Sequence, residues 1–231
     1  MSLVGATLVR RLHRFGALVH VPDGEWYVHV PSSGRLAELL FPGNEVLVQA
    51  ARRPGGKTQG RIVFARDRDV WVSIDTQVPT RILGRLLQER RLPPLAAYTR
   101  VRPEYPYGAG RIDFLLNGDE RGLPPCLLEV KSVTLVQDGV ALFPDAPTLR
   151  GARHLDELAR ARAEGLRAAV LFLVQRPDAR CFRPHDRQDP PFGQALRRAA
   201  AQGVEVYAYR CRVDPPRVEV LTDEPVPVDL S

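Results

Sequence analysis

Three residues near the middle of the 231-residue chain have types and a spacing suited to metal-assisted hydrolysis. Asp113 lies in one apolar run, and Glu129 and Lys131 lie in the next, beyond a turn expected at Asn117-Gly118-Asp119. Such runs are typical of buried strands, where an uncompensated charge costs several kcal/mol. Residues two apart in a strand project from the same face. We therefore expect two adjacent strands to bring both carboxylates and the ammonium group to one place, where a divalent metal compensates the charge.

Phosphodiester cleavage is the chemistry that this set fits. Magnesium binds oxygen ligands and retains several waters, so Asp113, Glu129 and the backbone carbonyl of Val130 suffice to hold it. Only two of the 33 cationic residues are lysines, one of them Lys131. A lysine is a compact charge whose pKa shifts on burial, so it can position or deprotonate a water or balance the charge of a phosphate. The alternative to a metal site is a structural role for these residues. Glu129 and Lys131 would then form a solvent-facing ion pair on an edge strand, and Asp113 would pair with Arg111.

Composition limits the class of protein. The chain is 44% hydrophobic and has no apolar segment of membrane-spanning length or secretory signal, so we expect a cytoplasmic protein without a membrane partner. Its three cysteines form no CxxC pair, which argues against disulfides and a zinc ribbon. The net charge of +6 lies in residues 1–91, with 14 Lys and Arg against 8 Asp and Glu, while residues 92–231 have 19 of each. This asymmetry favours a nucleic-acid partner, although an arginine-rich soluble surface explains it too.

The first 78 residues are rich in short β-type runs separated by Pro, Gly, Ser and Asn. Five or six strands in about seventy residues predict a small closed barrel, with the OB fold as the leading candidate. We therefore expect residues 1–78 to form an OB-like domain that binds nucleic acid. The expected strands lie near residues 7–9, 17–21, 26–30, 45–48, 61–64 and 70–74.

Residues 79–231 alternate between strand and helix patterns, which predicts an α/β domain with a mixed central sheet. The apolar run Ala168–Val174 suits a strand covered on both faces. Asp145 is a candidate cap for a helix ending near Gly165, and Asp189 opens another that ends at Gly203. The other expected elements are a helix from Pro79 to before Pro93 and strands near 99–103, 111–117, 126–135 and 204–209.

An acid on one strand followed by Glu-x-Lys on the next resembles the PD-(D/E)XK nuclease fold. The surrounding sequence is more specific and resembles the sugar fermentation stimulation protein A family. The segments that carry this resemblance are Arg111–Phe114, Glu129–Leu135, Phe143–Ala146, Thr148, Arg150-Gly151 and His154-Leu155. In the N-terminal part the chain has Ser32-Ser33-Gly34 where members of the family tend to have Asn-Thr-Gly or Asn-Ser-Gly.

The resemblance implies an OB-like domain followed by a nuclease-like domain in a DNA-binding protein. It assigns Asp113 and Glu129 as metal ligands and Lys131 as the catalytic cation, with Glu104 as a further acid. It also favours Arg150 and His154 as contacts to nucleic acid over an ordinary polar helix face.

We expect, in sum, a DNA-binding protein with a nuclease site that depends on Mg²⁺ or Mn²⁺. Arg81 and Arg85, on the helix after the barrel, are further candidates for contacts to phosphate, although such charges are often only a solvated face. A regulator that keeps the nuclease fold without turnover is the alternative, and a module with no nucleic-acid role is the third. Self-association into a homo-oligomer is also open.

Overall fold

The N-terminal part of the computed structural model is a closed five-stranded barrel. Residues 3–51, 57–118 and 122–231 are described. β1 pairs with β2 and β4, β5 pairs with β4, and a parallel pairing of β3 with β5 closes the barrel. In β2 the side chains of Ala17, Val19 and Val21 are buried and that of His20 is exposed. This alternation is typical of a strand with one face in the core and the other in solvent. The barrel strands are β1 (Leu3–His13), β2 (Gly16–Val21), β3 (Gly24–His29), β4 (Glu45–Ala50) and β5 (Gly60–Asp67). A sixth strand, β6 (Val70–Ser73), pairs with β5 outside the closed ring.

The C-terminal part is built on a six-stranded mixed sheet in the order β15-β14-β12-β9-β8-β7. β12 lies between two parallel neighbours, β9 and β14, and its residues Ala168–Val174 are all buried, as the continuous apolar run predicts. The strands are β7 (Arg100–Tyr107), β8 (Gly110–Asn117), β9 (Cys126–Val133), β12 (Arg167–Val174), β14 (Glu205–Asp214) and β15 (Arg217–Pro225).

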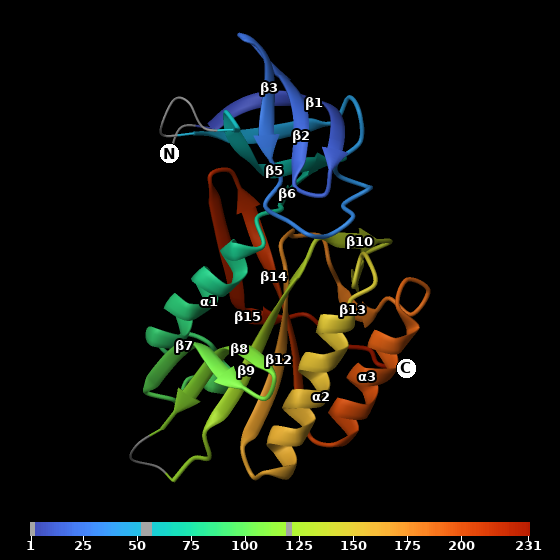
Figure 1. Ribbon diagram of the computed structural model, residues 1–231. Coiled ribbons are helices and arrows are strands. Elements are labelled where there is room, and N and C mark those ends of the chain that lie inside the picture. The colour runs from blue at the N-terminus through green and yellow to red at the C-terminus, as the bar shows by residue number, and fades with distance from the viewer. Residues whose placement is uncertain (1–2, 52–56, 119–121) are drawn as a thin grey trace.

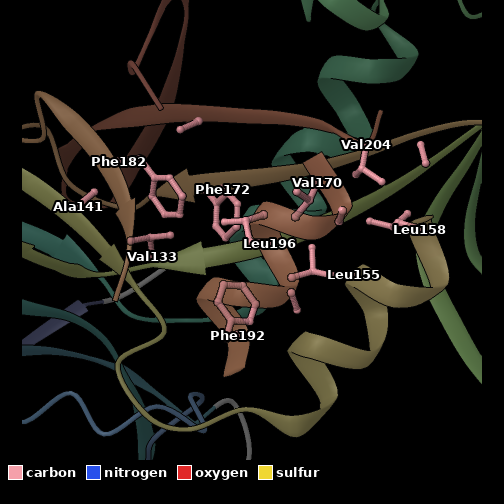
Figure 2. Close-up of a cluster of buried hydrophobic side chains, with 14 of the residues drawn as sticks. Val133, Ala141, Leu155, Leu158, Val170, Phe172, Phe182, Phe192, Leu196 and Val204 are labelled. Carbon is pink, nitrogen blue, oxygen red and sulfur yellow. The ribbon is translucent and has the colours of Figure 1, made fainter. Parts of the chain in front are cut away.

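Helices cover both faces of this sheet (Figure 1). α1 (Gln77–Gln88) packs on one face, while α2 (Leu149–Ala163) and α3 (Pro190–Ala201) pack side by side on the other. Figure 2 shows the core under α2 and α3, where Phe172 from β12 contacts Phe182 and Phe192 with ring centroids 4.0 and 6.4 Å apart. The barrel followed by an α/β domain with a mixed sheet confirms the predicted fold class.

The helix termini show one correction to the prediction. Asp189 caps α3 by accepting from the backbone N–H of Phe192 at 3.1 Å, as expected. The cap of α2 is Thr148, whose Oγ1 accepts from the N–H of Gly151 at 3.0 Å, so the prediction of Asp145 was wrong. Asp145 instead accepts from the N–H of Leu36 at 3.1 Å and so joins the two domains.

Several strands were not predicted. β15 pairs with β14 at the sheet edge, and a separate small sheet contains β10 (Leu135–Gln137), β11 (Val140–Phe143) and β13 (Cys181–Pro184). β1 is longer than expected and a 3₁₀ turn, η1, covers Pro93–Leu95. β8 and β9 are antiparallel neighbours as expected, but Asp119 of the predicted turn lies outside the described residues. Within those residues, no helix is long and apolar enough to cross a membrane.

The barrel sits on one end of the α/β domain (Figure 1), and a buried arginine links them. Arg176 is 3% exposed and pairs with Asp67 of the barrel and with Asp178, each at 2.7 Å. The N–H of Ser73 donates to the carbonyl of Gln175 at 3.1 Å. These contacts fix the position of the barrel above the strand ends.

Candidate active site

The two predicted acids face each other across β8 and β9. The strands pair in register from Leu116 with Cys126 to Phe114 with Leu128, so the next opposing positions are Asp113 and Glu129. The regular ladder ends there, and the N–H of Val130 donates to Oδ2 of Asp113 at 2.7 Å. Opposing residues of an antiparallel pair project from one face, which brings both carboxylates to the side of the sheet that α2 covers.

Glu129 is the more enclosed of the two acids, with 4% exposure. Its Oε1 accepts from Nζ of Lys131 at 2.6 Å and contacts Nδ1 of His154. Its Oε2 is buried and has no hydrogen-bond partner. Burial raises the pKa of this carboxyl, but Lys131 and His154 outweigh it, so the net shift of the pKa is downward. Glu129 is therefore anionic at neutral pH with one oxygen left to bind a further positive group.

Asp113 has the opposite shift. Burial and then the negative charge of Glu129 raise its pKa to about 6, against the lowering effect of the Val130 N–H. Two carboxylates brought together in a poorly solvated place repel each other, and a divalent cation between them relieves that repulsion.

His154 comes from the first turns of α2 and is 2% exposed. Its Nε2 lies 3.3 Å from Nε of Arg150, one turn earlier in the helix. Arg150 is always a donor, so Nε2 accepts and Nδ1 carries the hydrogen donated to Glu129. Nζ of Lys131 approaches the same Nδ1 at 3.4 Å. A chain of contacts thus runs from Arg150 through His154 to Glu129 and Lys131.

The group lies at the bottom of a cleft of about 540 Å³ between the two domains. One wall comes from the barrel side, through Arg14, the loop Ser32–Gly34 and Leu36, and the start of α1 adds Thr76 and Thr80. The other wall comes from β9, the loop 143–148 and the start of α2. The loop that contains Ser32–Gly34 contacts the loop 143–148. Oδ2 of Asp145 accepts from the backbone N–H of Leu36, and the same carboxylate leaves no space for a side chain at Gly34.

The donors fit a hard divalent cation. Asp113, the free Oε2 of Glu129 and the carbonyl of Val130, which also lines the cleft, are oxygen ligands of the kind magnesium uses together with waters. No group of three or more His, Cys, Asp or Glu side chains gathers at ligand distance in the described part of the chain, so a cation held by the two carboxylates would take its further ligands from backbone oxygen and water.

Glu104 lies at the exposed edge of this cluster. The register of β7 with β8 places it opposite Asp113, but its side chain is exposed and pairs with Arg111 at 3.4 Å. Its φ of +53° is rare for a residue with a side chain, and such strain is found mainly at functional positions. After burial and Glu129, the charge of Glu104 also contributes to raising the pKa of Asp113, so the role of Glu104 as a further acid stays a prediction.

The remaining predicted residues divide into two groups. Arg150 and His154 both line the cleft, and the buried His154 also contacts Glu129, so a contact of either residue with nucleic acid stays a prediction. Arg81 lines a separate hollow under β15, and Arg85 pairs with Glu89 at 3.7 Å. Neither of these two arginines lines the cleft.

Sequence reasoning missed the role of the barrel in this site. Arg14 was not singled out, because only the tertiary structure brings the first strands of the chain beside β9 and α2. The one available signal was the segment Ser32-Ser33-Gly34, which occupies the place of a family motif but departs from it at the first position and was given no role.

Comparison with known proteins agrees with this architecture. Residues 9–74 match the SfsA N-terminal OB domain, and residues 77–217 match the sugar fermentation stimulation protein RE domain. The chain belongs to the sugar fermentation stimulation protein family. Among its relatives are sugar fermentation stimulation protein homologues from Symbiobacterium thermophilum, 51% identical over 91% of this chain and 89% of that protein, and from Moorella thermoacetica, 46% identical over 99% and 97%.

A solved member of the family has the same fold. The structure of SfsA from Pyrococcus furiosus superimposes with a TM-score of 0.88 at 26% identity, covering 99% of this chain and 96% of that one. That protein was determined in complex with Ca²⁺. The family resemblance and the OB barrel expected from the sequence are thereby confirmed.

Proposed function

We propose that this member of the sugar fermentation stimulation family is a DNA-binding phosphodiesterase that depends on Mg²⁺ or Mn²⁺. The observation that carries the proposal is Oε2 of Glu129, a buried anionic oxygen without a partner that lies on the same face as Asp113. The Ca²⁺ complex of the Pyrococcus relative supports a divalent cation as the missing partner.

The chain's own residues have distinct roles in this proposal. Asp113, Glu129 and the Val130 carbonyl hold the cation, which when bound polarises the phosphoryl oxygens and lowers the pKa of a bound water. Lys131 presents its ammonium group at the cleft and balances the negative charge that develops on the phosphate. His154 fixes the rotamer of Glu129, and Arg150 at the rim offers a guanidinium to a phosphate.

The test is strand scission by purified variants with Mg²⁺ or Mn²⁺. Glu129→Gln and Lys131→Ala should each lower the cleavage rate at least about 100-fold while binding of DNA in EDTA persists. Glu205→Gln is the matched control, because Glu205 is also an ion-paired carboxylate of the central sheet, bound to Arg167 at 2.6 Å outside the cleft. Equal cleavage rates for the wild type, the two site variants and the control variant would show that the activity does not come from this site.

A non-catalytic DNA-binding protein is the second candidate. It is favoured by the partial neutralisation of Glu129 by Lys131 and His154, and by the pairing of the exposed Glu104 with Arg111. It predicts binding with a steep dependence on salt and no scission at any concentration of magnesium or manganese.

A further inference from the structure

A second hollow of about 650 Å³ adjoins the candidate active site on the barrel side. We call it the barrel groove. It contains three arginines, one histidine and no acidic residue, so its field attracts a polyanion. Its lining residues are Arg11, Leu12, His13, Arg14, Ser33, Gly34, Arg35, Ala37, Leu40, Ala146 and Pro147.

The arginines of the groove have two different roles. Arg11 is half-buried and donates to the carbonyls of Arg14 at 2.6 Å and Gly34 at 3.0 Å, so it holds the β1–β2 turn against the following loop. Arg14 and Arg35 are exposed, and neither forms an ion pair with any described residue. Their guanidinium groups are therefore available to an external ligand.

The barrel groove continues into the cleft. The two hollows share Arg14, Ser33, Gly34, Ala146 and Pro147 as a common rim. A chain molecule that lies in the groove is thereby led toward Glu129 and Lys131 at the bottom of the cleft.

Exposed apolar side chains accompany this basic path. Leu12 in the groove is 43% exposed, and Phe15 in the turn beside it is 45% exposed with its ring near-parallel to that of His29. Leu149, on the rim of the cleft next to Arg150, is 90% exposed. Apolar and aromatic side chains beside free cations are the arrangement that binds unpaired bases together with their backbone.

From this arrangement we infer that the barrel groove binds a single strand of DNA and delivers its backbone to the active site. The inference rests on the proposed function and specifies its substrate as unpaired rather than duplex DNA. In a duplex the base faces are stacked on one another and hidden from Leu12 and Phe15, whereas an unpaired strand exposes them. The phosphates of the same strand can meet Arg14 and Arg35.

The experiment measures binding of a labelled oligonucleotide, single-stranded or annealed to its complement, over a range of salt in EDTA. Wild-type protein should bind the single strand at least about tenfold more tightly. Arg14→Ala with Arg35→Ala should lower the slope of log K against log salt by about 1.4, because each phosphate contact to a single strand contributes about 0.7. Phe15→Ala should weaken binding about tenfold without changing the slope.

Arg187→Ala with Arg217→Ala is the matched control, because it removes the same charge from exposed positions outside the groove and cleft. The inference is overturned by equal affinity for the two DNA forms, or by the groove variant and the control having the same slope. Cleavage with Mg²⁺ then separates the two proposals. Scission of single-stranded and duplex DNA at equal rates would reject single-strand binding by the barrel groove but support the phosphodiesterase activity. Groove-dependent binding of the single strand without scission would support the groove and reject the phosphodiesterase activity.

Discussion

Replacing Asp113 by Asn should stabilise the metal-free protein at neutral pH. Burial and Glu129 raise the pKa of Asp113 from 3.8 to about 6 in the folded chain. The folded state thus binds this proton more tightly than the unfolded state. Metal-free wild type therefore loses stability as the pH rises from about 4 to 6 and keeps that loss above 6. The shift of about two units corresponds to about 3 kcal/mol at most.

Asparagine removes the charge and retains an oxygen for the Val130 N–H. For a chain of this length, about 3 kcal/mol raises Tm by roughly 6–12 °C. The measurement is thermal unfolding in EDTA at pH 4 and pH 8. The variant should match wild type at pH 4, where the carboxyl is mostly protonated in the fold, and exceed it at pH 8. Added Mg²⁺ should raise Tm of the wild type more than that of the variant.

Asp178→Asn is the control with the opposite sign. Burial raises the pKa of Asp178, but Arg176 outweighs it and the net shift is downward, so removing this charge should destabilise the fold at pH 8. A Tm for Asp113→Asn that is equal to or below wild type at pH 8 in EDTA would refute the claim that the two carboxylates repel each other in an enclosed site.

Three other substitutions test the scaffold by chemical denaturation. Arg176→Ala leaves Asp67 without its partner across the domain interface and should cost about 3–5 kcal/mol, with separate unfolding of the barrel. Gly34→Ala places a Cβ 2.5 Å from the Asp145 carboxylate, so it should cost about 1–3 kcal/mol, and Asp145→Ala in the same chain should restore most of that loss. Leu155→Ala empties a fully buried site beneath α2 and should cost about 2–5 kcal/mol.

Arg212→Ala is the control for the interface arginine. Its ion pair with Glu219 at 3.3 Å is exposed, so the loss should stay under about 1 kcal/mol. Equal losses of stability for Arg176→Ala and Arg212→Ala would show that the buried ion pair does not hold the two domains together. A double variant at positions 34 and 145 that is no more stable than Gly34→Ala would show that Asp145 is not the group that excludes a side chain at Gly34.

Local sequence patterns predicted most strands of the barrel and of the central sheet, and the shared face of Glu129 and Lys131, but not β15 or the small separate sheet. Alternating and continuous apolar runs specify which side of a strand is buried, so the placement of Glu129 and Lys131 on one face and the double burial of Ala168–Val174 followed directly. Helix ends followed where a local signal existed, as at Asp189 and Gly203. Local chemistry was insufficient at Asp145, because its partner Leu36 is more than a hundred residues away.

The tertiary structure alone decided what surrounds those acids. The register of β8 with β9 set Asp113 opposite Glu129, and the docking of α2 placed His154 beneath the pair and left Oε2 of Glu129 without a partner. Arg14 lines the cleft because the barrel sits over the end of the sheet, whereas Arg81 lines a separate hollow between the barrel, α1 and β15, and Arg85 pairs with Glu89. Contacts between elements distant in sequence depend on how whole faces pack, and no spacing within one segment encodes them.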